Sequence, residues 1–265
     1  MRPNSLIRRP LALSGLATAP AIGGLWALCA WEARQARRGP RPYEQALAAD
    51  GRLGPEGPPV RVAWLGDSLA SGLGVDHVED TPAQVVAHML ERPVEVTVLA
   101  VPGAKVLDVL TQQLPRLDRS SDLVVVCVGA NDVAATGSRQ RYADRYDTML
   151  SSIAPIPTLA LSLPDMSTPG RLAEPLRTLA GARARWFEAG RSKVVERHPH
   201  AASVDIASRP AGLTQRAARA SLCADQFHPG PVGYRLWAER IATLAHELLP
   251  PVGAPTMASE AMSAR

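Results

Sequence analysis

Residues 60–72, VRVAWLGDSLASG, join an apolar run typical of a buried β-strand to a turn of small residues. The change occurs at Gly66-Asp67-Ser68, where the apolar pattern stops. A serine at the end of a strand is more often an ordinary turn or helix-capping residue than a nucleophile. The triplet by itself therefore assigns no role to Ser68, and its meaning depends on the rest of the chain.

Further apolar runs alternate with helical patterns along the chain. We expect strands at residues 60–66, 94–100, 122–129, 157–163 and 201–206. One helix is expected to begin at Thr81-Pro82, and four more to cover about 105–114, 139–152, 171–197 and 230–249. The run at 122–129 is almost wholly apolar, as expected of a strand covered on both faces. This alternation predicts an α/β fold, namely a three-layer α/β/α flavodoxin-like sandwich with a central parallel five-stranded sheet.

The basic charge of the chain is concentrated at its start. The 265 residues have a sequence pI of about 9.3 and a formal net charge of +4. Residues 1–41 contain seven arginines and a single acidic residue, Glu32, so the remainder is slightly acidic. A nucleic-acid-binding domain needs clustered basic side chains on its own surface. This distribution argues against nucleic acid as a partner.

Residues 10–31 carry no charge and follow Arg8-Arg9, a pattern typical of an export signal or a membrane anchor. We therefore predict an exported, extracytoplasmic protein that is membrane-anchored or secreted. The sequence leaves open whether the segment is cleaved and whether export follows the Sec or the twin-arginine route. The predicted parts are a signal sequence or N-terminal anchor at 1–41, a Pro/Gly-rich linker at 42–58, a folded domain at 59–250 and a disordered tail at 251–265.

Ligands of open parallel sheets bind beyond the carboxyl ends of the strands. Small or polar residues follow three of the predicted strands there, namely Gly66-Asp67-Ser68, Gly103 and Gly129-Ala130-Asn131-Asp132. If the first strand lies between the other two, Ser68 is flanked by Gly103 on one side and Asn131 on the other. This convergence is the first support for a catalytic serine.

A serine nucleophile needs a general base, and the base needs a group that orients it. Of the six histidines, His228 lies between the last predicted strand and the last helix, on the side where Ser68 is expected. Asp225 precedes it by three residues, a spacing that lets a loop carboxylate contact the imidazole. The pair His198 and His200 has no Cys or carboxylate at ligand spacing. We expect neither a metal nor an organic cofactor.

The blocks Gly66-Asp67-Ser68-Leu69, Gly103, Gly129-Ala130-Asn131-Asp132 and Asp225-Gln226-Phe227-His228-Pro229 occur in the order and at the spacing of a known family. With them the chain resembles the SGNH (GDSL-type) hydrolase family over about residues 60–249, and it looks like the exported members of high-GC actinobacteria. The resemblance implies Ser68 as nucleophile, His228 as base and Asp225 as its orienting residue. It also implies an oxyanion hole made by the backbone N–H groups of Ser68 and Gly103 and the side-chain amide of Asn131.

Three more residues of these blocks, Asp67, Gly129 and Asp132, are implied to support the turns rather than to react. The second block departs from the family pattern. The family usually has Asn two residues before the glycine and a hydroxyl residue soon after it. Here Val101 stands at the first of these places and Ala104 or Lys105 at the second. Among the implied donors, this departure concerns Gly103.

The expected reaction is the cleavage of carboxylic esters, esterase- or lipase-like, through an acyl-enzyme on Ser68. A carbohydrate O-acetyl esterase and a non-catalytic, membrane-tethered flavodoxin-like binding module are the alternatives. The expected partners are a small-molecule, lipid or glycan ester and, if the N-terminal segment is uncleaved, a membrane. A disulfide between Cys127 and Cys223 is left open.

Overall fold

The computed structural model describes residues 18–38, 46–47, 49–135 and 137–251. The chain divides into two units, Met1–Gly39 and Pro40–Arg265. In the first unit the described residues form one helix, α1 (Thr18–Arg38). Within the described ranges, no helix combines the length and the apolar character needed to cross a bilayer. The predicted signal or anchor lies partly outside these ranges, and the predicted tail almost wholly, so both remain predictions.

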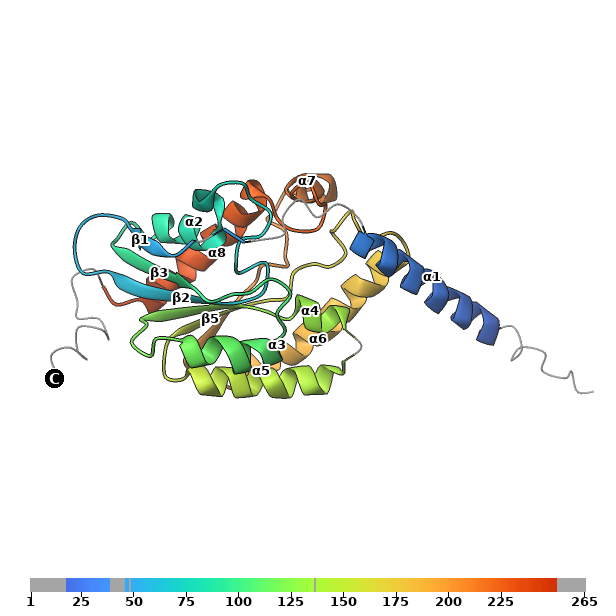
Figure 1. The fold of residues 1–265 in the computed structure, drawn as a ribbon, viewed down its shortest axis with the longest axis horizontal. Helices are drawn as coiled ribbons and strands as arrows, with labels where there is room; N and C mark the ends of the chain where they lie inside the picture. The colour runs from blue at the N-terminus through green and yellow to red at the C-terminus, as the bar shows by residue number, and fades with distance from the viewer. Residues whose placement is uncertain (1–17, 39–45, 48, 136, 252–265) are drawn as a thin grey trace, which may run out of the picture. The chain divides into compact units, whose positions relative to one another are not determined.

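The second unit contains a six-stranded sheet with the order β1-β3-β2-β4-β5-β6 (Figure 1). Its strands are β1 (Gly51–Leu53), β2 (Val60–Gly66), β3 (Val94–Val98), β4 (Leu123–Cys127), β5 (Thr158–Leu161) and β6 (Ala201–Val204). The edge strand β1 pairs antiparallel with β3, and all other pairings are parallel. β2 lies between β3 and β4, which is the arrangement that places Ser68 between the two neighbouring strand ends.

The mainly parallel α/β/α architecture is confirmed, but the predicted number of five strands is wrong. The additional strand, β1, lies within the predicted linker at 42–58. It has three residues, of which one is glycine and one is arginine, so it carries no recognisable strand pattern. Its position follows from pairing with β3, where Gly51 lies opposite Val96 and Leu53 opposite Val94.

Helices cover both faces of the sheet, α2 and α8 on one and α3, α5 and α6 on the other (Figure 1). The helical segments of this unit are η1 (Val78–Asp80), α2 (Pro82–Met89), α3 (Val106–Asp108), η2 (Val109–Gln113), η3 (Leu114–Arg116), α4 (Ala130–Ala134), α5 (Arg139–Ile153), α6 (Leu176–Val195), α7 (Gln215–Ala220) and α8 (Pro231–Leu248). The helix predicted at 171–197 begins later, because Pro175 disfavours helical backbone at the residue before it. The helix predicted at 105–114 is a short α-turn followed by a π-helical turn.

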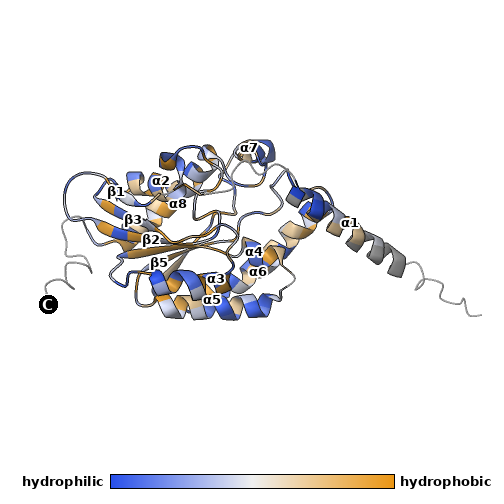
Figure 2. Ribbon diagram, in the orientation of Figure 1, coloured by the Kyte–Doolittle hydropathy of each residue, from blue (hydrophilic) through white to orange (hydrophobic). Residues whose placement is uncertain are grey.

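Alternate side chains of the central strand β2 supply the two cores, as the two-residue period of a strand requires. Ala63 and Leu65 belong to the core shared with α5 and α6, whereas Val62 and Trp64 belong to the core shared with α2 and α8. Figure 2 shows hydrophobic colours along the central strands and hydrophilic colours on parts of the covering helices. The sheet is therefore covered on both faces, and its strand ends form a fixed edge.

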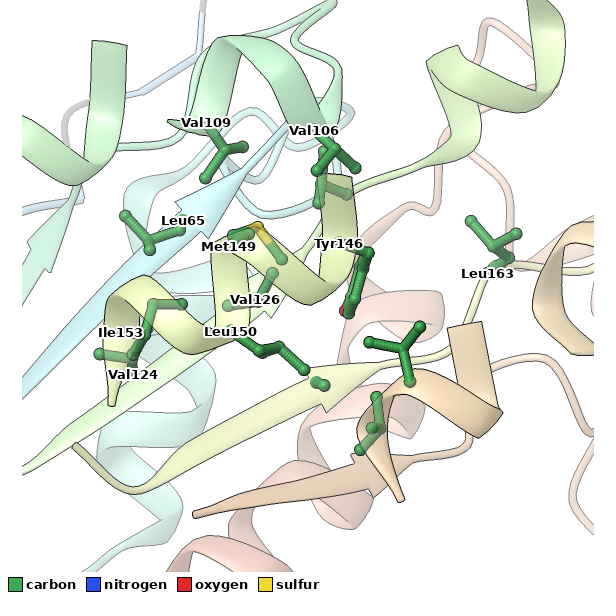
Figure 3. Packing of buried hydrophobic residues seen from close by; sticks show 14 of the residues in the cluster. Leu65, Val106, Val109, Val124, Val126, Tyr146, Met149, Leu150, Ile153 and Leu163 are labelled. Atoms are coloured by element: carbon green, nitrogen blue, oxygen red, sulfur yellow. The ribbon is translucent and has the colours of Figure 1, made fainter. Parts of the chain in front are cut away.

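Helix α5 shows how closely one face is covered. Its residues Tyr146, Met149, Leu150 and Ile153 recur at helical spacing and are fully buried. They lie over side chains of the two central strands, Leu65 among them (Figure 3). Close packing of this kind resists displacement of the strands, so the residues that follow each strand keep their relative positions.

Candidate active site

Ser68 lies in a sharp turn at the carboxyl end of β2. Gly66, the last residue of the strand, has φ +140°, and a Cβ there would collide with the carbonyl oxygen of Cys127. Glycine is required at this point because both the backbone conformation and the close approach exclude a side chain. The Asp67 N–H donates to the Cys127 carbonyl at 3.0 Å, and the Leu73 N–H donates to the Ser68 carbonyl at 2.9 Å. The turn is thus held on both sides of Ser68.

The three residues predicted to act together are joined by hydrogen bonds. Nε2 of His228 lies 3.0 Å from Oγ of Ser68, and Nδ1 lies 2.6 Å from Oδ2 of Asp225. A carboxylate only accepts hydrogen bonds, so the ring proton belongs on Nδ1. Nε2 then carries the lone pair that accepts the Ser68 hydroxyl proton. The β2 turn and the loop between α7 and α8 therefore form one serine–histidine–carboxylate chain.

The carboxylate of Asp225 is shielded from solvent and well supplied with donors. Its side chain is 6% exposed and that of His228 is 15% exposed. Oδ1 accepts the backbone N–H groups of Phe227 and His228, at 2.8 and 2.9 Å, and the thiol of Cys223 at 2.9 Å. Burial alone would raise the pKa of Asp225, but the hydrogen bonds from His228 and Cys223 outweigh it and hold this pKa well below its usual range. Asp225 is therefore ionised beside His228.

The segment after Ser68 packs directly against the loop that carries His228. Gly74 has φ +116°. A Cβ there would lie 3.1 Å from Cβ of His228 and would collide with the backbone carbonyl oxygen of Pro229. On the other side of this segment, the Tyr234 hydroxyl donates to the Leu73 carbonyl at 2.7 Å. These contacts set the distance between the two loops, and hence between Ser68 and His228.

The loops beyond β3 and β4 bring the predicted oxyanion donors to the same edge. Gly103 is exposed with φ +84°, and, its two chain neighbours apart, none of the described residues has a heavy atom within 4 Å of the place where its Cβ would be. Asn131 lies in α4, and its Nδ2 donates to the Ala104 carbonyl at 3.1 Å. The same nitrogen lies 3.4 Å from Oδ2 of Asp67. The amide of Asn131 thus connects the Gly103 loop with the residue that precedes Ser68.

A match to a family model assigns the chain to a protein family. The GDSL-like lipase/acylhydrolase family model matches residues 64–236, which include Ser68, Asn131 and His228. The chain belongs to this family. The sequence matches no curated protein.

Solved structures show the same fold at low identity. A lipase/acylhydrolase from Enterococcus faecalis aligns with a TM-score of 0.57 at 18% identity, covering 74% of this chain and 100% of that one. An extracellular lipase from Streptomyces rimosus aligns with a TM-score of 0.51 at 19% identity, covering 71% and 99%. Axe2, an acetylxylan esterase from Geobacillus stearothermophilus, aligns with a TM-score of 0.50 at 16% identity, covering 69% and 93%.

In this GDSL-like hydrolase, the residues predicted to support the turns make buried contacts. Oδ1 of Asp67 accepts the Leu69 N–H at 3.0 Å, and burial raises the pKa of Asp67 to about 7. Oδ2 of Asp132 accepts the Val106 N–H at 3.1 Å, which ties α4 to α3. Gly129 has φ +129°, and a Cβ there would come within 2.7 Å of neighbouring side chains. Each of the three holds a loop of the site in place.

Gln113, at the end of the π-helical turn η2, supports the site without any signal in the sequence. Its side chain is 1% exposed, and its amide pairs with both backbone groups of Gly66, as acceptor from the N–H and as donor to the carbonyl, each at 2.8 Å. The pair fixes the residue from which the Ser68 turn starts. π-Helical turns are frequent at functional sites, but no local sequence pattern connects residues 47 positions apart.

Arg183 of α6 is a second residue that the sequence analysis did not single out. Its guanidinium donates to the carbonyls of Val133, Ala135 and Gly137, at 2.7, 2.9 and 2.8 Å. These carbonyls lie at and just after the C-terminal end of α4, where helical carbonyls lack partners within the helix. Arg183 therefore holds the short helix of this GDSL-like hydrolase that carries Asn131.

The remaining sequence candidates have ordinary surroundings. Cys127 and Cys223 are free thiols, so the disulfide left open by the sequence is not formed. His198 lies 3.0 Å from Oδ1 of Asp147, and His200 lies 3.1 Å from the Leu150 carbonyl, so both histidines contact α5. In the part of the chain that the structure describes, no group of three or more His, Cys, Asp or Glu side chains is arranged to hold a metal ion.

Proposed function

We propose that the protein hydrolyses carboxylic esters and that Ser68, His228 and Asp225 form its catalytic triad. The observation that carries the proposal is the unbroken hydrogen-bonded chain, 3.0 Å from Ser68 to His228 and 2.6 Å from His228 to Asp225. Membership of the GDSL-like lipase/acylhydrolase family supports the reaction class. The low pKa of Asp225 supports its role as the permanent anion that orients and stabilises the imidazolium.

In the acylation step, Oγ of Ser68 attacks the ester carbonyl carbon while Nε2 of His228 takes the hydroxyl proton. The carbonyl π electrons move onto oxygen, which becomes the oxyanion of a tetrahedral intermediate. When the intermediate collapses, the C–O bond to the alcohol breaks and His228 gives its proton to the departing oxygen. The products of this step are the alcohol and an acyl ester on Ser68.

In the deacylation step, water attacks the acyl carbonyl and gives a proton to His228. Collapse of the second tetrahedral intermediate breaks the bond to Oγ, and His228 returns the proton to Ser68. The carboxylic acid leaves and the resting enzyme is restored. His228 therefore acts as base and then as acid in each half of the cycle.

The oxyanion is stabilised by the backbone N–H groups of Ser68 and Gly103 and by the Asn131 amide. The open space in front of Gly103 supports its part, because a substrate oxygen can reach the backbone there. The amide of Asn131 has two protons, and one is donated to the Ala104 carbonyl. The second lies near Asp67 at 3.4 Å, a weak contact that the charged oxygen of the intermediate would replace.

Hydrolysis of p-nitrophenyl acetate, butyrate and octanoate by the full-length chain tests the proposal. We expect turnover by the wild type and none above background for Ser68→Ala or His228→Ala. Ser151→Ala, an exposed serine on α5, is the matched control and should keep full activity. Turnover that survives in Ser68→Ala would contradict the assignment of the nucleophile.

A carbohydrate O-acetyl esterase is the second candidate, supported by the shared fold of Axe2, an acetylxylan esterase. Acetylated xylan, tested beside the three p-nitrophenyl esters, separates the candidates. Release of acetate together with no turnover of octanoate favours the carbohydrate esterase. A folded chain that hydrolyses none of these esters and is not labelled by a fluorophosphonate would favour the membrane-tethered binding module instead.

Export is proposed separately, from the charge-free segment at 10–31 and its basic flanks. Either a cleaved signal or an uncleaved anchor places the folded domain outside the cytoplasm. N-terminal sequencing of the protein recovered from membrane and soluble extracytoplasmic fractions distinguishes the two. Recovery of the intact chain from the cytoplasm alone would contradict the proposal.

A further inference from the structure

Cys223 lies two residues before Asp225, in the loop between α7 and α8. Its Sγ is 2.9 Å from Oδ1 of Asp225, and the residue is 7% exposed. An ionised carboxylate has no proton to give, so the thiol must donate in this contact. Cys223 therefore hydrogen-bonds the one triad member that does not itself touch Ser68.

Backbone contacts fix the direction in which the thiol points. The Cys223 N–H donates to the His228 carbonyl at 2.8 Å, and its carbonyl accepts the Gln226 N–H at 2.9 Å. On the opposite side, a Cβ on Gly74 would lie 3.3 Å from Sγ, so the segment that follows Ser68 packs against the sulfur. The thiol is enclosed between the two loops of the site with Asp225 as its acceptor.

We propose that Cys223 is a positioning residue of the triad, whose thiol holds the Asp225 carboxylate in place and withdraws part of its charge from His228. The inference rests on the proposed ester hydrolysis for its catalytic consequence, but not for the interaction itself. Oδ1 accepts Cys223 and two backbone N–H groups, while Oδ2 alone faces the imidazole. Without the thiol, more of the negative charge is available to stabilise a protonated His228.

The thiol remains a donor over the whole working range of pH. Burial and the adjacent Asp225 carboxylate raise the pKa of Cys223 to about 12, so ionisation does not remove the proton. Other ionisable groups near the pair include Asp67 beside Ser68, Tyr234 of α8, and Arg171, whose Nη1 lies 3.5 Å from the Asp225 carbonyl. These groups are unchanged in variants at position 223, so a difference between such variants reports the thiol.

The test compares Cys223→Ala with Cys223→Ser in the full-length chain by two measurements. The first is the titration of the His228 ring followed by NMR, assigned by its loss in His228→Ala; it needs no substrate. The second is the pH dependence of kcat/KM for p-nitrophenyl acetate. Cys29→Ala, which removes a thiol of α1, is the control for the NMR titration.

We expect Cys223→Ala to move the His228 titration to higher pH by roughly 0.5 unit, because the carboxylate then stabilises the imidazolium more strongly. The acidic limb of kcat/KM moves with it, and the plateau falls by about three- to tenfold as Asp225 loses a donor. Cys223→Ser keeps a donor and should titrate close to the wild type. If the alanine variant does not fold, Cys223→Val fills the volume without a donor and takes its place.

An unmoved His228 titration in folded Cys223→Ala, or identical titrations of the alanine and serine variants, would overturn the inference. Failure of the proposed function gives a different result. A shifted titration in a protein that hydrolyses no ester would support the role of Cys223 and contradict the esterase. Normal hydrolysis by all variants, together with an unmoved His228 titration, would support the esterase and contradict the role of Cys223.

Discussion

Nε2 of His228 lies 3.0 Å from Oγ of Ser68, although 160 positions separate the two residues in the chain. Neither residue is placed by the other. Ser68 is placed by the turn at Gly66, which Gln113 holds, and His228 is placed by a loop that packs against Gly74. Disturbing any of these supports is therefore expected to act on the contact between Ser68 and His228, the proposed nucleophile and base.

Gly74→Ala tests the packing between the two loops. We expect loss of ester hydrolysis and a free energy of unfolding lowered by roughly 2–4 kcal/mol, because relief of the collision moves the His228 loop. Gly212→Ala is the matched control, since Gly212 has φ +82° with open space around it. It should cost about 1 kcal/mol and keep activity. Full activity of folded Gly74→Ala would show that the close approach is not needed.

Gln113→Leu tests the support of the nucleophile turn. The change removes both hydrogen bonds to Gly66, so we expect a free energy of unfolding lowered by roughly 2–4 kcal/mol and a fall of at least about tenfold in kcat/KM. Gln112→Leu alters the exposed neighbouring glutamine and should change neither quantity. Denaturant unfolding and ester hydrolysis measured on both variants give the comparison. Equal effects of the two substitutions would argue against a specific role for Gln113.

Asn131→Ala tests the proposed side-chain donor of the oxyanion hole. We expect kcat to fall by roughly 10²–10³-fold with little change in KM, because the interaction strengthens only as charge develops on the oxygen. Initial rates over a range of p-nitrophenyl acetate concentrations separate the two constants. A variant in which KM rises while kcat is unchanged would assign Asn131 to substrate binding instead.

Asp67→Asn tests the buried carboxyl beside Ser68 through stability. Burial raises the pKa of Asp67 from its usual 3.8 to about 7. Between these values the folded state binds more protons than the unfolded state, so the stability of the wild type falls as pH rises. The asparagine side chain has no carboxyl group to titrate, so the free energy of unfolding of Asp67→Asn lacks this decrease. Measured relative to the wild type, it should rise by on the order of 3 kcal/mol from about pH 4 to about pH 7. A difference that does not change with pH would contradict the raised pKa.

The sequence predicted the elements whose evidence is local. The strand at 60–66 begins and ends where β2 does, and Pro82 opens α2 as its position after Thr81 indicates. The order of the three central strands is confirmed, and it explains why Ser68, Gly103 and Asn131 meet at one edge. Asp225 and His228 could be found because their spacing and their place before the last helix were both visible in the chain.

The remaining features depend on contacts between distant residues. β1 exists through its pairing with β3, and its three residues have no strand pattern of their own. Gln113 stands in a stretch that looks helical, and its role arises from a backbone 47 positions away. The sequence shows Cys223 only as a cysteine that could pair with Cys127, whereas its contact with Asp225 follows from the closed loop around them. Such roles require the folded geometry.

Covalent labelling reports directly whether Ser68 is a nucleophile activated by His228. The full-length chain is treated with a fluorophosphonate, and the adduct is located by intact mass and peptide mapping. We expect one adduct per chain on Ser68, none in Ser68→Ala, strongly slowed labelling in His228→Ala and normal labelling in Ser151→Ala. An unlabelled wild-type chain, or an adduct on a different residue, would contradict this expectation.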